Sequence, residues 1–295
     1  MSLKLNWCLI QIGGVNSIIM MTSPINGPTQ ISNIKLDNIY LNDITSFLKV
    51  KAVASLIINQ VTVIDTGPES SDDVESILID LTEISSSVNG AYQISNIVAN
   101  QSQITLVSIS NSNQVKTISQ SIAISNILYT NGYYEFANDI ISTGTITSSG
   151  QFYVSFTNLT FSDIVFVRNA NLLNFKHQSP NEFLVKDMTV SNVTAAGVLI
   201  QAFDVFMTNR PVKVKFQNLL ATGINSEFKS FIQLQTGADI QIVDSSFEYM
   251  STLESGAVIK AGSSKAIANI YDSSFTNNTA VEAPVFVTEK ESVVR

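Results

Sequence analysis

The feature that most constrains the fold of this chain is a short motif that recurs along it with a period of about 30 residues. In the motif, apolar residues alternate with other residues and are followed by two polar residues and a final apolar residue, as in residues 240–247 and 268–275. The four clearest copies end at almost equal intervals, at Val190, Leu219, Phe247 and Phe275. A period of this length indicates a repeat architecture in which each repeat contacts only its neighbours.

Looser copies extend the repeat towards the N-terminus. Their final apolar residues are less evenly spaced than the later ones, at Ile39, Val61, Ile97, Ile127 and Leu159. Another copy ends at Ile84, less than half a period before Ile97, so the sequence leaves the register between Val61 and Ile109 open. The nine copies predict about nine coils and, at a strand spacing of about 4.8 Å, a rod about 45 Å long.

A second apolar segment follows most copies, so each repeat supplies at least two short strands, for example at residues 197–200 and 256–259. Ile, Val, Thr, Phe and Tyr are frequent, and such side chains favour strands. Residues 71–78 are ambiguous, because Ser71 suits the start of a short helix whereas Ile77 and Ile79 alternate as in a strand. The sequence therefore predicts an all-β, right-handed parallel β-helix.

We expect this β-helix to span residues 31–295, after an N-terminal cap or leader-like segment at residues 1–30. No amphipathic cap follows the strand expected at residues 284–287, and an uncovered coil exposes backbone donors and acceptors. The sequence leaves two alternatives open: either the last residues fold over the final coil, or the β-helix is truncated at its C-terminus and belongs to a longer rod.

A polar residue precedes the final apolar residue in every copy: Asn38, Gln60, Asn96, Asn126, Asn158, Thr189, Asn218, Ser246 and Ser274. Asparagine tolerates left-handed backbone angles, and its amide can bond the amides of the coils on either side. We interpret this column as a polar ladder that faces inward or lies at a turn and fixes the register. The alternative is an exposed array that matches a repetitive ligand. The apolar column from Ile39 to Phe275 is expected to form the core.

Two segments carry a resemblance to known families. Residues 275–280, Phe-Thr-Asn-Asn-Thr-Ala, match the Phe-x-x-Asn-x-Ala signature of polymorphic outer-membrane-protein-type repeats, and residues 255–258 resemble their Gly-Gly-Ala-Ile strand. Met250 departs from the signature, which has Asn there. More widely, residues 31–290 resemble pectin-lyase-like β-helices, including those in Asn/Ser/Ile-rich surface proteins of ciliated protozoa. The resemblance implies the fold and a secreted or cell-surface setting, but no ligand.

Charge and composition limit the classes of partner and site that this chain can have. A net charge of -8 with only 16 Lys and Arg residues argues against nucleic acid, which binds clusters of basic residues. Cys8 is the only cysteine, so the chain forms no internal disulfide or thiolate metal site. No apolar stretch reaches the roughly 18 residues of a membrane helix. We expect protein or carbohydrate partners at an extracellular or cell-surface location; glycosylation sequons stand at Asn100, Asn158, Asn192 and Asn277.

The same fold carries polysaccharide enzymes, whose glycosidases need paired carboxylates. The family's Asn-Thr-Asp, Gly-His-Gly and Arg-x-Lys motifs are absent, Asp72 and Asp73 lie in an acidic loop, and His177 has no His or Cys partner nearby in the sequence. We therefore predict a non-enzymatic structural or adhesive module with no catalytic residues and no cofactor. The alternative is a divergent polysaccharide lyase or glycoside hydrolase of the pectin-lyase-like class.

Aromatic residues provide the first candidate binding site. They cluster after the Ile127 copy, at Tyr129, Tyr133, Tyr134 and Phe136. Exposed tyrosines stack on sugars or anchor protein partners. The alternative is a loop that packs back onto the coil.

Acidic residues provide the second candidate site. We expect Asp187, Asp244 and Asp272 to share a column that Phe216 interrupts. Asp244 and Asp272 would then lie one coil apart and form a candidate cation site. The alternative is that these carboxylates accept hydrogen bonds from amides at the turns.

Overall fold

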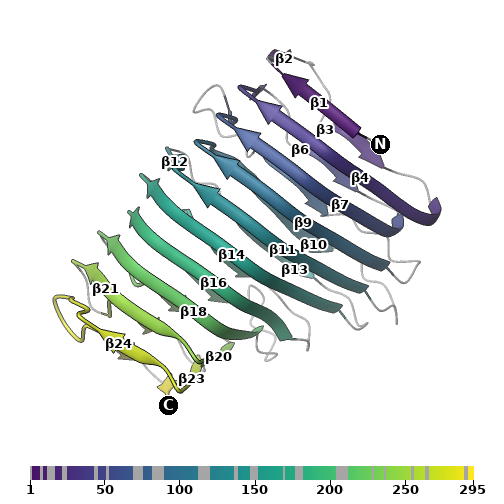
Figure 1. Cartoon of the computed structure of the whole chain (residues 1–295). Helices are drawn as coiled ribbons and strands as arrows, with labels where there is room; N and C mark the ends of the chain where they lie inside the picture. Colours follow the sequence, from purple (N-terminus) through teal and green to yellow (C-terminus); the bar gives the residue numbers. More distant parts are fainter. Residues whose placement is uncertain are drawn as a thin grey trace.

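The computed structural model is a parallel β-helix, in which two long sheets enclose one apolar core (Figure 1). It describes residues 2–6, 9–11, 17–21, 25–42, 46–50, 53–68, 76–81, 90–111, 120–135, 139–146, 152–168, 170–176, 182–203, 212–227, 229–235, 237–253, 256–262, 266–288 and 292–295. Within these ranges every strand pairing is parallel and no residue is helical. The predicted all-β fold class is confirmed.

The first sheet contains the longer strands, stacked along the rod in this order: β1 (Ser2–Asn6), β4 (Ile25–Asp37), β7 (Val53–Ile64), β9 (Gly90–Asn100), β11 (Gln120–Thr130), β14 (Phe152–Phe166), β16 (Glu182–Ala195), β18 (Val212–Ser226), β20 (Ala238–Val243), β23 (Ile267–Tyr271) and β26 (Val293–Val294). Three further strands pair within this sheet outside that order: β12 (Tyr133–Tyr134) with β14, and β21 (Ser246–Thr252) with both β18 and β24 (Ser274–Thr276).

The second sheet contains shorter strands in the order β25 (Phe286–Thr288), β22 (Ile259–Ala261), β19 (Ile232–Leu234), β17 (Ile200–Phe203), β15 (Leu173–Lys176), β13 (Ile141–Ile146), β10 (Thr105–Asn111), β8 (Ile77–Leu81), β6 (Ser46–Val50) and β3 (Ser17–Met21). A small third sheet pairs β2 (Leu9–Gln11) with β5 (Tyr40–Asn42). Strands β1 and β3 already pair in the two main sheets; the predicted domain boundary after residue 30 stays a prediction.

The β-helix has about seven regular turns, compared with the nine predicted. From β4 to β18 each coil has one uninterrupted long strand, whereas in the next two coils this strand is divided, into β20 and β21 and then into β23 and β24. Part of the ambiguous region of the sequence is described, whereas residues 71–75, where a short helix was the alternative, lie outside the described residues. Residues 77–81 form the strand β8, and Val61 pairs with Ile97, so the long step between them is a single coil.

The core consists of side chains that stack in columns from coil to coil. Because alternate strand residues point to the same face, each inward position faces its equivalents one coil away. One such column in the first sheet is Ile31, Ile58, Ile94, Ile124, Phe156, Val185, Phe216, Ile242 and Ile270. Phe175 of the second sheet contacts it across the interior, with its ring 6.1 Å from that of Phe156 and 6.4 Å from that of Phe216.

Two sharp corners recur in the long strands, and both have left-handed backbone angles. The first corner consists of Asn33, Gln60, Asn96, Asn126, Asn158, Asp187, Asn218, Asp244 and Asp272. The second corner consists of Asn38, Asp65, Gln101, Asn131, Asp163, Asn192, Gly223, Tyr249 and Asn277. In each of these nine pairs the two corners are five residues apart, as Asn33 and Asn38 are, and all φ values lie between 44° and 65°. Asn and Asp recur because they adopt this conformation at low cost.

Side-chain hydrogen bonds connect neighbouring coils at both corners, and they form a continuous amide ladder at the first. At the first corner Asn126 Nδ2 donates to Asn96 Oδ1 at 3.0 Å, and Asn158 Nδ2 donates to Asn126 Oδ1 at 2.9 Å. At the second corner Asn192 Nδ2 donates to Asp163 Oδ1 at 2.6 Å. These amides are exposed, so the ladder lies at the turns and does not face inward. The predicted ladder exists, on the outer surface.

The register of the predicted ladder was partly wrong. Gln60, Asn96, Asn126, Asn158 and Asn218 do share the first corner, but Asn38 belongs to the second corner. Thr189, Ser246 and Ser274 lie two residues beyond the first corner. The error arises because side chains one and three residues after the corner point inward, so an apolar residue at either position fits the motif. Val190, Phe247 and Phe275 accordingly belong to the inner column that contains Phe161, and Phe275 is only partly buried.

The Asn126→Ala variant should lose about 2–3 kcal/mol of unfolding free energy, because it breaks two exposed ladder bonds and forces alanine into a left-handed conformation. The Asn126→Gly variant is the matched control, since glycine adopts this conformation freely and loses only the amide. We expect it to lose about half as much. Urea unfolding followed by circular dichroism measures both. Equal losses would contradict a role for the left-handed conformation.

Candidate functional site

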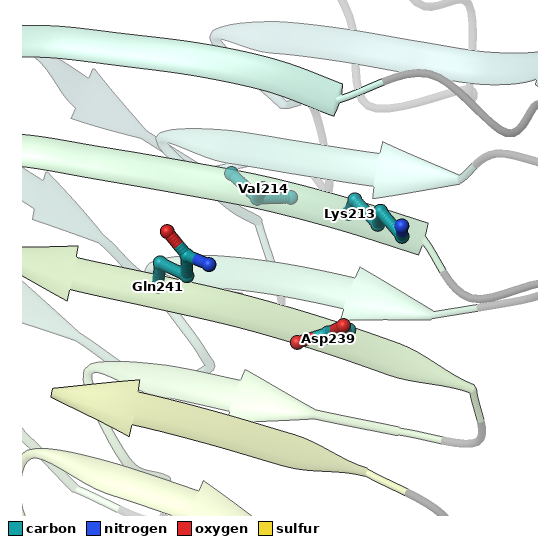
Figure 2. A pocket seen from close by; sticks show the side chains of 4 residues that line it. All are labelled: Lys213, Val214, Asp239 and Gln241. Atoms are coloured by element: carbon teal, nitrogen blue, oxygen red, sulfur yellow. The ribbon is translucent and has the colours of Figure 1, made fainter.

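A hollow of about 90 Å³ lies between β18 and β20 and is lined by Lys213, Val214, Asp239 and Gln241 (Figure 2). Lys213 and Asp239 occupy equivalent positions on these paired strands. An ammonium, a carboxylate and an amide therefore lie together on an open surface, where they can form hydrogen bonds with a polar ligand but cannot exclude water.

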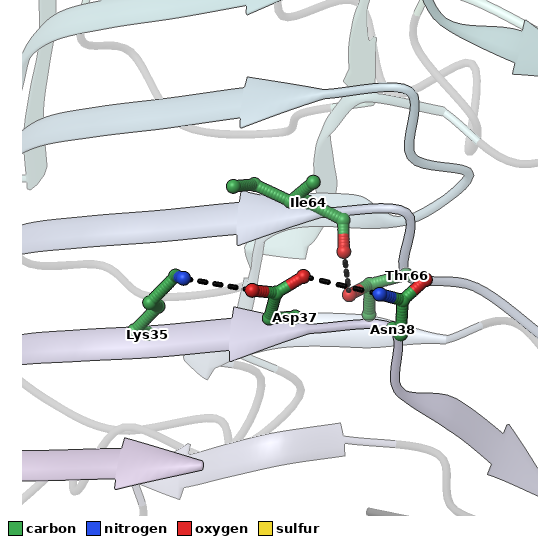
Figure 3. A network of polar contacts seen from close by, with 5 residues as sticks. All are labelled: Lys35, Asp37, Asn38, Ile64 and Thr66. Carbon is green, nitrogen blue, oxygen red and sulfur yellow. Dashed lines mark hydrogen bonds and ion pairs between the residues drawn. The ribbon is translucent and has the colours of Figure 1, made fainter. Parts of the chain in front are cut away.

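A polar network at the N-terminal coils has a structural role. Lys35 forms an ion pair with Asp37 at 2.7 Å, and Asn38 Nδ2 donates to the other carboxylate oxygen at 3.3 Å (Figure 3). The pair is partly exposed, and such pairs contribute about 0–1 kcal/mol. In the next coil Thr66 Oγ1 donates to the Ile64 carbonyl at 2.9 Å across the second corner. These contacts stabilise the turns and present no site.

The predicted aromatic site is largely buried. Tyr129 and Tyr134 have no exposed surface, and their rings pack 6.0 Å apart. The Tyr129 hydroxyl donates to the Ser102 carbonyl. The Tyr134 hydroxyl lies 2.7 Å from the Tyr129 hydroxyl and 2.9 Å from the Ile104 carbonyl oxygen. Burial raises the pKa of both hydroxyls well above the ordinary value. The expectation that these two side chains are exposed is corrected, and the alternative of a segment packed onto the coil holds for them.

One member of the aromatic cluster is on the surface. Tyr133 is 57% exposed and pairs in register with Val165, which is 38% exposed, while Val167 beyond it is 46% exposed. Exposed Glu135 and Arg168 flank these residues. We call Tyr133, Val165 and Val167 the Tyr133 patch. Phe136 lies outside the described residues. The patch combines an aromatic ring with aliphatic side chains and nearby charges on β12 and β14, as small contact surfaces do. Binding there stays a prediction.

The candidate cation site has the expected position. Asp244 and Asp272 occupy the first corner of adjacent coils, and both are exposed. The interruption was misplaced, because Asn218 rather than Phe216 stands between Asp187 and Asp244. Asn218 Nδ2 donates to Asp187 Oδ1 at 2.8 Å, as the alternative of turn carboxylates requires. In the described part of the chain, no three His, Cys, Asp or Glu residues converge as metal ligands do. Cation binding by Asp244 and Asp272 stays a prediction.

Two corner residues were missed by sequence reasoning. Gly223 and Tyr249 follow one another at the second corner, where all other members are Asn, Asp or Gln. Tyr249 is 60% exposed and has a φ of 53°. They can be found in the sequence because each lies five residues after a first-corner residue. This search succeeds only when the first corner has been placed in the correct register. Three sequon asparagines also occupy corners: Asn158, Asn192 and Asn277.

Among the described residues, no helix has the length and hydropathy needed to cross a lipid bilayer. Comparison of the chain with protein-family models, with curated proteins and with solved structures finds no match. The resemblance to pectin-lyase-like proteins and to outer-membrane-protein-type repeats therefore stays a prediction beyond the shared fold class, which is a parallel β-solenoid.

Proposed function

We propose that this chain is a non-enzymatic, rigid β-helix module of a secreted or cell-surface protein, and that it contacts a protein or a glycan through its side faces. The observation that carries the proposal is the Tyr133 patch. Tyr133 and Val165 belong to paired strands of the first sheet, and the Val167 amide donates to the Tyr134 carbonyl at 2.8 Å, so the rod holds all three residues in a fixed arrangement. A pre-ordered aromatic surface loses little conformational entropy on binding.

The construction of the rod supports the same role. One apolar core runs along the coils, and hydrogen bonds between exposed corner side chains link several neighbouring coils. Such a solenoid holds surface groups at fixed spacings over several coils, which suits an extended partner. The corner sequons Asn158, Asn192 and Asn277 agree with a secretory route, on which we propose that they are glycosylated. The module is proposed to act within a longer chain or an assembly.

The Tyr133→Ala variant should lose at least about tenfold in affinity for its ligand, as expected when an exposed aromatic anchor is truncated. A glycan array and capture of surface proteins supply the ligands, and titration calorimetry measures the affinity. The control is Tyr153→Ala, which removes a ring that is 51% exposed and belongs to β14. Equal binding by the Tyr133→Ala variant and the wild-type chain would contradict the proposed contact surface.

A turnover assay distinguishes this module from an enzyme. The wild-type chain should release no sugars from polysaccharides, and neither should the Asp244→Asn and Asp272→Asn variants. Depolymerisation by the wild-type chain that either substitution abolishes would overturn the non-enzymatic assignment. Both aspartates are exposed and accessible to substrate, so the assay tests the carboxylates that the structure places on adjacent coils.

A further inference from the structure

The second corner contains a break in its pattern of side chains. Of its nine members, Asn, Asp and Gln account for all except Gly223 and Tyr249, which lie in consecutive coils. Gly223 provides no side chain, and Tyr249 provides a large ring that is 60% exposed. Asn192 lies in the coil before Gly223, and Asn277 lies in the coil after Tyr249.

Tyr249 occupies this corner at a cost in backbone energy. A φ of 53° is unfavourable for a bulky side chain, whereas Asn or Gly adopts it readily. The exposed ring gains little from burial in return. A strained, exposed aromatic residue indicates a position kept for contact with a ligand, because nothing in the packing of the rod requires it.

The missing side chain at Gly223 opens a gap in the column. Coils are about 4.8 Å apart, so the side chains of Asn192 and Tyr249 stand about 9.6 Å apart along the rod. A Cβ atom at Gly223 would meet only the Asn192 backbone, with the nitrogen at 3.6 Å and Cα at 3.8 Å. No atom of Tyr249 lies within 4 Å of this Cβ position, so the space outside Gly223, between the side chains of Asn192 and Tyr249, is open. Along the rod, the distance between these two side chains is large enough for one flat ring to lie between them.

We propose that this gap binds one neutral glycosyl ring, which packs its apolar face against Tyr249. The inference rests on the proposed role in glycan contact and gives it a second site. Aromatic rings present an apolar face that suits the C–H face of a pyranose. Polar groups surround the gap: Asn225 and Thr222 are exposed, and Ser251 Oγ donates to Asn225 Oδ1 at 3.1 Å. The one carboxylate beside them, Glu248, pairs in register with Thr222 and accepts a hydrogen bond from Ser246 Oγ at 3.3 Å. Its negative charge disfavours an acidic sugar and so favours a neutral one.

Asn192 forms the opposite wall of the gap. Its Nδ2 donates to Asp163 in the preceding coil, so its carbonyl oxygen is directed to the Gly223 side, as in the repeating ladder at Asn126. This oxygen can accept a hydrogen bond from a sugar hydroxyl. Asn192 is also a sequon with Thr194, and its amide nitrogen keeps a second hydrogen that a sugar can replace. The bound ring thus comes either from a free glycan or from a glycan on Asn192 itself.

The first arm of the test uses unglycosylated chain from a bacterial host. Neutral disaccharides, cellobiose and diacetylchitobiose, are titrated and followed by saturation-transfer NMR. We expect binding that weakens at least tenfold in Gly223→Asn, which fills the gap, and in Tyr249→Asn, which removes the ring. Both substitutions restore a regular corner, so both variants should fold. Tyr271→Asn is the control, because Tyr271 is 52% exposed and lies outside both corners.

The second arm uses chain secreted from a eukaryotic host, and mass spectrometry measures the glycan on Asn192. Occupied Asn192, with disaccharide binding lost and then restored by Thr194→Val, identifies the chain's own glycan as the occupant. Disaccharide binding that persists with Asn192 unmodified identifies a free glycan. Wild-type affinity in both gap variants, or no disaccharide binding together with unmodified Asn192, overturns the proposal. Loss of glycan binding in Tyr133→Ala alone would leave the proposed function standing without this second site.

Discussion

The Phe175→Ala variant should lose about 3–5 kcal/mol of unfolding free energy, the range measured for buried Phe-to-Ala substitutions. Phe175 is 1% exposed and comes from the second sheet. Its ring lies 5.1 Å from that of Phe183 and within 6.4 Å of those of Phe156 and Phe216, all in the first sheet. Truncation leaves a cavity between the two sheets. The strands on either side cannot move in to fill it, because backbone hydrogen bonds to the adjacent coils hold them in place.

Urea unfolding followed by far-ultraviolet circular dichroism measures this loss. Tyr153→Ala is the control, because it also removes a ring but from an exposed position, and surface substitutions change stability by about 0.5 kcal/mol or less. Unfolding proceeds coil by coil in many solenoids, so the loss is read from the transition that includes β15. A change below about 1 kcal/mol in Phe175→Ala would contradict the packing described for the core.

The folded chain should lose stability steeply as the pH rises above about 10, the ordinary pKa of tyrosine. Burial raises the pKa of three tyrosines, Tyr92, Tyr129 and Tyr134. Their folded-state pKa values exceed those of the unfolded chain, so the folded state retains protons that the unfolded state releases. Stability is therefore complete below about pH 10 and falls above it, by about 1.4 kcal/mol per pH unit for each tyrosine.

Unfolding free energies measured in urea at a series of pH values from neutral to strongly alkaline test this slope. The matched variant replaces Tyr92, Tyr129 and Tyr134 by Phe. It should be less stable at neutral pH, because hydroxyl hydrogen bonds are lost, yet it should decline much less above about pH 10. All other ionisable groups are the same in both proteins and cancel in the comparison. The same alkaline slope in both proteins would contradict the inferred burial effect.

Most of the fold could be predicted from the sequence because each repeat shows the same local pattern of alternating apolar and polar residues. Alternation between apolar and polar residues assigns each side chain to the core or to the surface, and every coil repeats it, as Ile94, Ile124 and Phe156 do. Asn126 and Asn158 were placed correctly because asparagine favours the left-handed corner. The error at Thr189 and Ser246 has the same local origin, since a slip of two residues keeps every side chain on its own face.

The candidate sites could not be predicted as well, because exposure depends on the neighbouring coils. Tyr129, Tyr133 and Tyr134 are chemically alike in the sequence, yet only Tyr133 is on the surface. The chain bends at the left-handed corner residue Asn131, and a Cβ atom on the following residue, Gly132, would lie 2.6 Å from the Tyr129 ring. Nothing local in the sequence fixes that arrangement.

The sequence by itself determined that the chain stacks short strands into a parallel β-helix, because strand alternation and the regular return of one motif are local patterns. Only the tertiary structure decided which polar residues share a corner, because that depends on strand pairing between neighbouring coils. It made two of the three tyrosines part of the core and placed Gly223 beside Tyr249 on the surface. The burial of a side chain and the register between coils both depend on how neighbouring coils pack, so the sequence of one repeat cannot determine them.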